Sequence, residues 1–123
     1  MMARDLELTE LLDSCIKTYA RENRFLEFKS NHVSPDDLGK YISSLSNGAC
    51  LERKENGYLF FGVDDCSHKV IGTSFDIATA KKGSQDLELY LRVNVTPKIN
   101  FQVERFFYKG NENTIQELIG VRK

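Results

Sequence analysis

Apolar side chains recur along the chain with two periods, one typical of helices and one typical of strands. Within residues 5–19 they fall three or four positions apart, which predicts an amphipathic helix. A second helix is predicted from Ser34, which can cap the amino end, with Pro35 in the first turn and two aspartates after it. A third is predicted over residues 84–95, with Pro97 ending it.

Five strands are predicted between and after these helices, at residues 24–29, 58–63, 69–75, 98–108 and 114–123. The segment YLFFGV, 58–63, is almost entirely apolar, which is typical of a central strand buried on both faces. The segment 69–75 follows it after a short polar turn, so we expect the two to form a hairpin. Residues 47–57, polar and bounded by glycine, are predicted to form a loop before the central strand.

The predicted order of elements is α-β-α-β-β-α-β-β, and this order indicates the fold class. Helices and strands mixed in this way suggest a two-layer α+β domain, in which helices pack on a mixed β-sheet. The length, 123 residues, suits one domain covering residues 1–123. Because the last predicted strand runs up to Lys123, we expect this domain to be the amino-terminal part of a longer chain, with further domains beyond it.

Composition and charge narrow the choice of partners. With 41% hydrophobic and 28% charged residues, the chain has the composition of a soluble globular domain. No apolar run approaches the roughly 18 residues of a membrane span, and the amino terminus does not resemble a signal peptide. We therefore expect a cytoplasmic protein with no membrane partner and with reduced cysteines. The formal net charge of −1 argues against a strongly basic nucleic-acid binder, although it leaves room for a local basic patch.

Carboxylates are the first candidates for chemistry. Glu22 precedes the first predicted strand, Glu27 lies among apolar residues inside it, and Asp64 and Asp65 follow the central strand. If these two strands are neighbours, Glu27 and the aspartates can come close together. Converging carboxylates would bind Mg²⁺ or Mn²⁺, which can activate water for phosphoryl transfer. The same spacing also suits a Glu27 that pairs with a nearby cation and aspartates that only form a turn.

Several motifs, taken in order, resemble the Alba-like domain of Schlafen-type proteins, also called AlbA_2 or divergent AAA-4. ENRFLEFK at 22–29 is similar to the family signature E-x-x-x-x-E-F-K, and GYLFFGVDD at 57–65 to G-x-L-x-x-G-V-x-D. KVIG at 69–72 matches the family's following strand, and ISSLSN at 42–47 and VTPKINFQV at 95–103 are similar to its second helix and to its I-x-P-x-I element. The resemblance covers about residues 8–122. The turn N-T-x-G-G of the family is replaced here by the longer, charged SNGACLERKENG.

The resemblance implies a nucleic-acid-binding module, with DNA as the first expected ligand, in a transcriptional regulator. Phosphates would then contact five cations, Arg21, Arg24, Lys29, Arg53 and Lys54. In vertebrate relatives the matching carboxylates form a metal-dependent ribonuclease site, here Glu22, Glu27 and Asp65. A metal-dependent endoribonuclease that uses Mg²⁺ or Mn²⁺ is therefore the second hypothesis, and otherwise no cofactor is indicated. The third hypothesis is a non-catalytic dimerisation or assembly domain that forms a homodimer.

Overall fold

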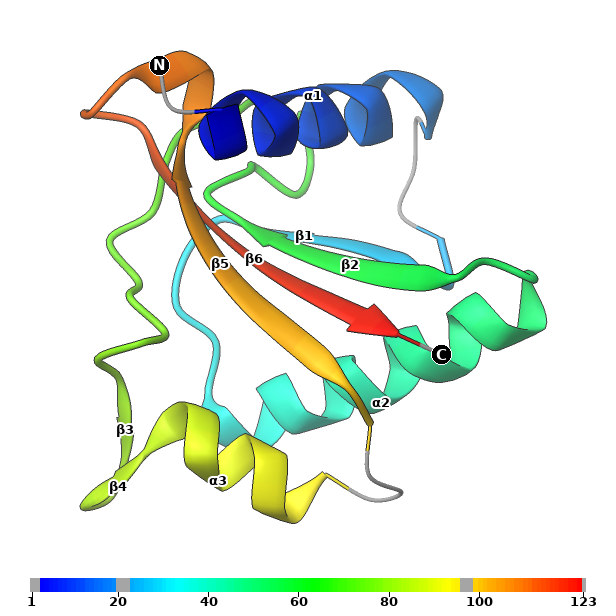
Figure 1. The fold of residues 1–123 in the computed structure, drawn as a ribbon, viewed down its shortest axis with the longest axis vertical. Helices are drawn as coiled ribbons and strands as arrows, with labels where there is room; N and C mark the ends of the chain where they lie inside the picture. Colours follow the sequence, from blue (N-terminus) through cyan, green and yellow to red (C-terminus); the bar gives the residue numbers. More distant parts are fainter. Residues whose placement is uncertain (1–2, 20–22, 96–98, 123) are drawn as a thin grey trace.

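A computed structural model describes residues 3–19, 23–95 and 99–122 (Figure 1). Its elements are α1 (Ala3–Thr18), β1 (Leu26–Lys29), α2 (Pro35–Leu51), β2 (Asn56–Phe61), β3 (Lys81–Lys82), β4 (Gln85–Asp86), α3 (Leu87–Asn94), β5 (Phe101–Phe107), a 3-10 helix η1 (Tyr108–Gly110) and β6 (Ile115–Arg122). The α+β class and the order of helices and strands are those predicted from the sequence. Within the described residues, no helix is long and apolar enough to cross a membrane.

The main sheet has the strand order β1-β2-β6-β5. β1 runs parallel to β2, with Glu27 opposite Leu59, whereas β6 is antiparallel to both of its neighbours. The sheet is therefore mixed, as predicted, and the first two predicted strands are neighbours. β3 and β4 form a separate short antiparallel pair ahead of α3.

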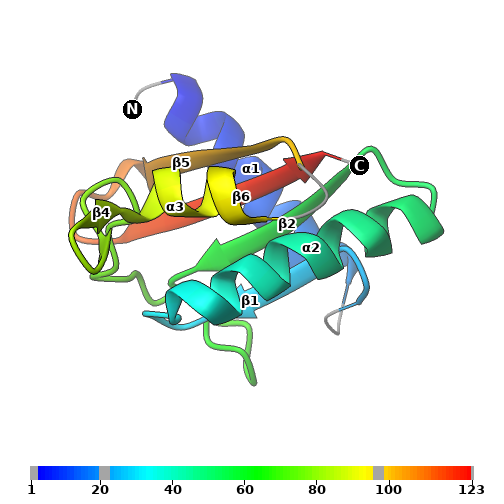
Figure 2. The same ribbon diagram turned by 90° about the horizontal axis from the view of Figure 1, so that it is seen from below.

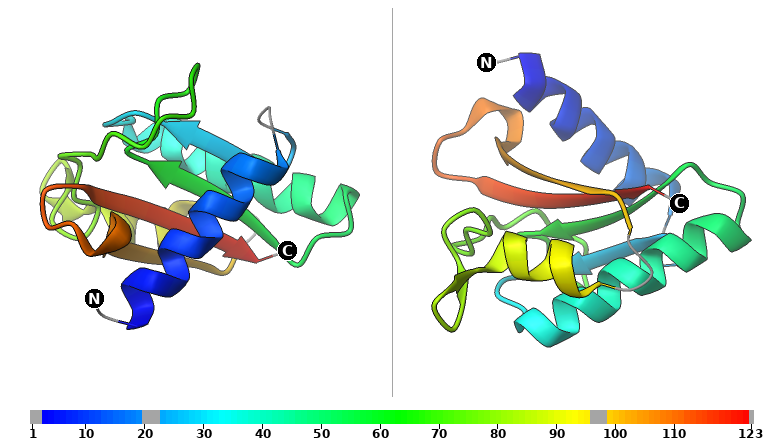
Figure 3. Two further views of the ribbon diagram at one scale, coloured as in Figure 1. Left: turned by 90° about the horizontal axis from the view of Figure 1, so that it is seen from above. Right: turned by 60° about the horizontal axis from the view of Figure 1, so that its bottom comes forward.

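Helices cover both faces of the sheet. α1 crosses one face diagonally, while α2 and α3 lie on the other (Figures 2 and 3). Phe60 of β2 packs in the cluster under α1, and its neighbours Leu59 and Phe61 pack in the cluster under α2 and α3. Because the central strands are apolar on both sides, the sheet is buried on two faces and not on the single face of a two-layer domain.

The helix α2 begins where the sequence predicts and ends later. Ser34 Oγ accepts a hydrogen bond from the Asp37 N–H at 3.3 Å, and Pro35 is the first helical residue. The predicted loop 47–57 is wrong at both ends, because α2 continues to Leu51 and β2 already starts at Asn56, which leaves residues 52–55 as the connection. Gly48 does not stop this helix. A Cβ built there would lie 1.7 Å from the carbonyl oxygen of Arg24, so the glycine permits a close helix–chain contact.

The strand predicted at 69–75 does not form. Val63 and Val70 make only an isolated bridge, and the N–H groups of Ile71 and Gly72 bond the carbonyl of Gly62. Both edges of β2 are already paired, one with β1 and the other with β6, so no edge is left for a third strand. The short strands β3 and β4 lie between β2 and α3 in the chain, where the sequence predicted the strand 69–75. Pro97, predicted to end the third helix, lies outside the described residues, and α3 ends at Asn94.

Candidate nucleic-acid interface

An open groove of about 420 Å³ runs between the β1 edge of the sheet and the carboxyl-terminal half of α2. Its lining includes Arg24, Glu27, Tyr41, Asn47 and Leu51. Glu27 belongs to this side of β1 because side chains alternate along a strand. Its neighbours Leu26 and Phe28 are buried in the cluster under α1. The carboxylate thus stands among apolar residues in the sequence but faces the opposite side of the strand.

Glu27 and Lys29 share this face and form an ion pair. The Lys29 Nζ lies 3.3 Å from the Glu27 Oε1, and each side chain is 23% exposed. The same ammonium lies 5.0 Å from the centre of the Tyr41 ring. A hydrogen bond with Tyr41 is the main cause that raises the pKa of Lys29, and Glu27 raises it further against the opposing effect of burial. Lys29 is therefore held charged by Glu27 and Tyr41, two residues that line the groove.

Three of the predicted phosphate-binding cations gather where α2 ends. The side chain of Arg24 is 66% exposed, and its Nε lies 4.0 Å from Glu52. Arg53 follows the helix in the left-handed conformation, with a φ of 57°, and the Lys54 Nζ lies 5.4 Å from the Phe25 ring centre. Positive side chains at this position also complement the negative end of the helix dipole. Arg21, the remaining predicted cation, lies outside the described residues.

Asp64 and Asp65 lie in the turn that follows β2. The Asp64 Oδ1 accepts hydrogen bonds from the N–H groups of Cys66 at 2.9 Å and Ser67 at 2.8 Å. These bonds lower the pKa of Asp64, the one from Ser67 most. The turn is anchored by His68, whose ring centre lies 4.8 Å from that of Phe28. Asp64 thus organises the turn, and Asp65 is exposed beside it.

Of the predicted metal-binding residues Glu22, Glu27 and Asp65, the structure describes Glu27 and Asp65. Glu27 faces α2, whereas the turn that carries Asp65 packs, through His68, on the face of β1 that looks toward α1. Among residues 3–19, 23–95 and 99–122, no three His, Cys, Asp or Glu side chains form a group that could hold a metal ion. Glu22 lies outside these ranges, so the trio of Glu22, Glu27 and Asp65 stays a prediction.

Comparison with known proteins gives the family. The family model described as Schlafen, AlbA_2 matches residues 22–122. This chain belongs to the Schlafen AlbA_2 family. The AlbA_2 match includes every predicted site residue except Arg21. The resemblance found in the sequence motifs is therefore confirmed.

The AlbA_2 domain is also similar to a solved structure, that of the DIP2311 protein from Corynebacterium diphtheriae. The sequence identity is 15% and the TM-score is 0.40. The similarity covers 98% of this chain and 22% of the other, so the chain spans about a fifth of that protein's length. No curated protein matches.

Two residues of the AlbA_2 groove were not recognised as site residues from the sequence. Tyr41 was assigned only to the buried stripe of the second helix, yet its side chain contacts Lys29. Asn47 was assigned to a loop, yet it is helical and lines the groove. A partial signal exists for Tyr41, because tyrosine in a helix stripe carries a hydroxyl that needs a partner when buried.

Proposed function

We propose that this AlbA_2 domain binds nucleic acid, with DNA as its first expected ligand, and serves as the nucleic-acid-contacting part of a transcriptional regulator. The observation that carries the proposal is that Arg24 lines the groove beside the carboxyl end of α2, where Arg53 and Lys54 follow in the chain. The family assignment supports it. The net charge of −1 means that phosphate attraction must come from a local patch of this kind.

Arg24 is the best-placed group for a phosphate. Its contact with Glu52 is long and exposed, and pairs of this kind contribute roughly 0–1 kcal/mol. A phosphate can therefore displace Glu52 and accept two parallel hydrogen bonds from the guanidinium. Lys29 acts differently, because Glu27 and Tyr41 already occupy its ammonium. Its charge is balanced by Glu27, so it is not free to follow a phosphate.

The test is a binding titration with fluorescent DNA duplex and structured RNA at several salt concentrations. Three phosphate contacts predict that log K falls with log salt with a slope of about −3. A variant with Arg24→Gln, Arg53→Gln and Lys54→Gln should bind at least about tenfold more weakly and lose most of this slope. The matched control removes three cations elsewhere, through Lys17→Gln, Lys40→Gln and Lys69→Gln. Equal losses in both variants, or a flat salt dependence, would contradict the proposal.

A metal-dependent ribonuclease is the second candidate, favoured by the position of Glu27 in the same groove as Arg24. The described residues do not by themselves fit a metal ion, so we assign no catalytic step to them. The same RNA, incubated with Mn²⁺ or with a chelator, decides between the two functions. Cleavage only with metal, absent in Glu27→Gln, would establish the nuclease. A shifted but intact band that is insensitive to chelator supports the binding module.

A further inference from the structure

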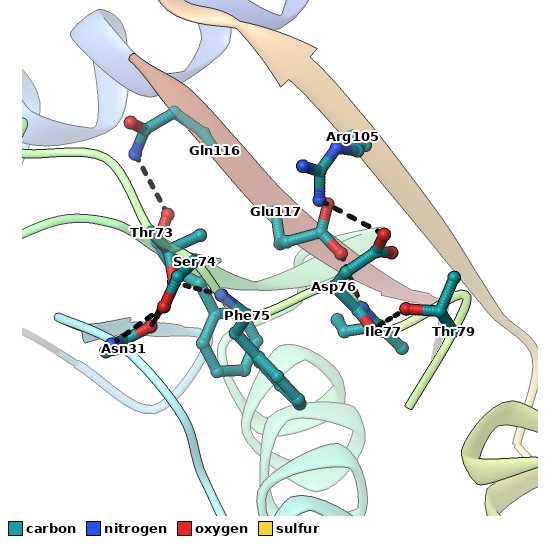
Figure 4. Close-up of polar contacts among 11 residues, drawn as sticks. Asn31, Thr73, Ser74, Phe75, Asp76, Ile77, Thr79, Arg105, Gln116 and Glu117 are labelled. Carbon is teal, nitrogen blue, oxygen red and sulfur yellow. Dashed lines mark hydrogen bonds and ion pairs between the residues drawn. The ribbon is translucent and has the colours of Figure 1, made fainter. Parts of the chain in front are cut away.

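Residues 72–80 form a strap that lies over the α2 and α3 side of the sheet without joining it (Figure 4). The Thr73 N–H donates to the carbonyl of Ile115 in β6 at 2.8 Å, and the Thr73 hydroxyl donates to Asn31 at 2.6 Å. Further along, Phe75 and Ile77 are buried in the core cluster. The strap is therefore held at one end by polar contacts and along its middle by apolar ones.

Glu117 of β6 holds the strap at Ile77. This carboxyl is 1% exposed, and its Oε1 accepts a hydrogen bond from the Ile77 N–H at 2.8 Å. Its Oε2 lies 3.6 Å from a guanidinium nitrogen of Arg105 on β5. The same nitrogen lies 3.7 Å from the Asp76 Oδ2 on the strap itself. Figure 4 shows both carboxyl groups turned toward this one guanidinium.

Two carboxylates thus share one cation at the border of the core, where Glu117 is buried and the side chains of Asp76 and Arg105 are 34% and 40% exposed. The Oε2 of Glu117 and the Oδ1 of Asp76 are buried and have no hydrogen-bond partner. Two ionised carboxyls leave one negative charge without its own counterion, and this is costly for Glu117 because its carboxyl is shielded from water. A proton removes that charge and converts one acceptor into a donor. The ligand that fits this cluster is therefore a proton.

We propose that Glu117, Asp76 and Arg105 form a proton-operated latch, which fastens the strap when Glu117 is protonated and loosens it when the proton leaves. The step is a simple ionisation: the O–H bond of Glu117 breaks, the proton passes to water and the carboxylate keeps the electron pair. The charged groups that act on Glu117 are Asp76, from the strap, and Arg105, from β5. Glu117 shares its face of β6 with Ile119 and Val121, whose core cluster receives apolar side chains such as Leu38 of α2 and Leu87 of α3.

The titration of Glu117 gives the direction of the effect. Its pKa is raised to about 7, with burial as the main cause and Asp76 as a smaller one, while the Ile77 N–H and Arg105 oppose the shift. In a loosened strap the carboxyl meets water and regains its ordinary value of 4.5. The closed strap therefore binds the proton more tightly. Opening becomes easier as the pH rises from about 4.5 and levels off above about 7.

The experiment follows amide hydrogen exchange of Ile77 by NMR, corrected for the intrinsic rate, from pH 5.5 to 8. The opening constant should rise roughly 30-fold over this range. Glu117→Gln keeps an acceptor for the Ile77 N–H and removes the ionisation, so its opening constant should not change with pH. Glu112→Gln, the same change in an exposed turn, should behave as wild type. An unchanged pH dependence in Glu117→Gln would overturn the latch.

A second measurement keeps the proposal testable if Glu117→Gln fails to fold. The side-chain carboxyl carbon of Glu117 in the wild-type protein should titrate with a midpoint near 7. Asp76→Asn should lower this midpoint and Arg105→Gln should raise it, because they remove a negative and a positive neighbour. A wild-type midpoint near 4.5, or shifts in the opposite directions, would sink the proposal.

Discussion

At the scale of single residues, Gly48 shows how one atom sets the position of a helix. A Cβ at this position would lie 1.7 Å from the Arg24 carbonyl oxygen, a backbone atom that cannot rotate away. We expect Gly48→Ala to lower the free energy of unfolding by about 3 kcal/mol or more in urea denaturation, because overpacking forces the backbone apart. The loss occurs although alanine normally favours a helix.

Gly39 in the same helix is the matched control for this prediction. Its added Cβ would meet only Val95 and Leu91 side-chain atoms, at 3.9 and 4.0 Å. Gly39→Ala should therefore raise the free energy of unfolding by about 0.5–1 kcal/mol, through helix propensity. Equal effects at both positions would show that the close contact of α2 with Arg24 does not decide the stability.

Glu27 provides the second prediction at this scale. Its carboxylate pairs with Lys29, and both side chains are only partly exposed. Because Gln keeps the shape and the hydrogen-bond acceptor, Glu27→Gln should lower the free energy of unfolding by no more than about 1 kcal/mol. Urea denaturation checks this value. A loss of several kcal/mol would make Glu27 a structural residue first, and binding or cleavage data on this variant would then need to be discounted for misfolding.

At the scale of elements, the sequence is informative where a pattern is local. Ser34 and Pro35 correctly predict the start of α2 because capping involves only neighbours in the chain. The end of α2 was missed because Gly48 reads locally as a helix stop, whereas its partner Arg24 lies far away in the sequence. The strand predicted at 69–75 is wrong for a similar reason, because a local pattern does not show whether a partner strand is available. Its alternation is suitable, but β2 has no free edge to pair with it.

In the candidate site, contacts between neighbours in the sequence could be predicted, whereas contacts between separate elements could not. The alternation around Glu27 correctly allowed a carboxylate on one face of β1 and apolar residues on the other. Its ion pair with Lys29, two residues later, was among the interpretations that the sequence offered. The Tyr41 contact with Lys29 and the sharing of Arg105 by Asp76 and Glu117 join separate elements. Such contacts cannot be derived without the sheet order that brings these elements together.

At the scale of the whole molecule, the β5 edge of the sheet bears on the dimerisation hypothesis. An unprotected edge strand invites pairing with a second copy. Here the Phe107 N–H donates to Asp5 at 3.1 Å, and the Phe101 carbonyl accepts from Arg92 at 3.0 Å, so both ends of β5 are occupied. We expect light scattering to give the mass of a monomer at micromolar concentration. A dimer mass would instead favour the assembly hypothesis and call for a different interface.

The latch also has a consequence for the stability of the whole domain. The pKa of Glu117 is raised to about 7 in the folded state, against 4.5 when the carboxyl is in water. The stabilising effect of its bound proton is therefore fully present below about pH 4.5 and is lost as the pH rises to about 7. The loss amounts to at most about 3 kcal/mol.

The difference between wild type and Glu117→Gln isolates this effect, because other carboxylates titrate equally in both proteins. Asp64, whose pKa is lowered, acts in the opposite direction and cancels in the difference. Between pH 5 and pH 8, urea denaturation should show the wild type losing stability relative to Glu117→Gln, since the variant has no charge to bury. A constant difference across this range would mean that Glu117 is ionised throughout, and that Glu117, Asp76 and Arg105 form a permanent ion network with no response to protons.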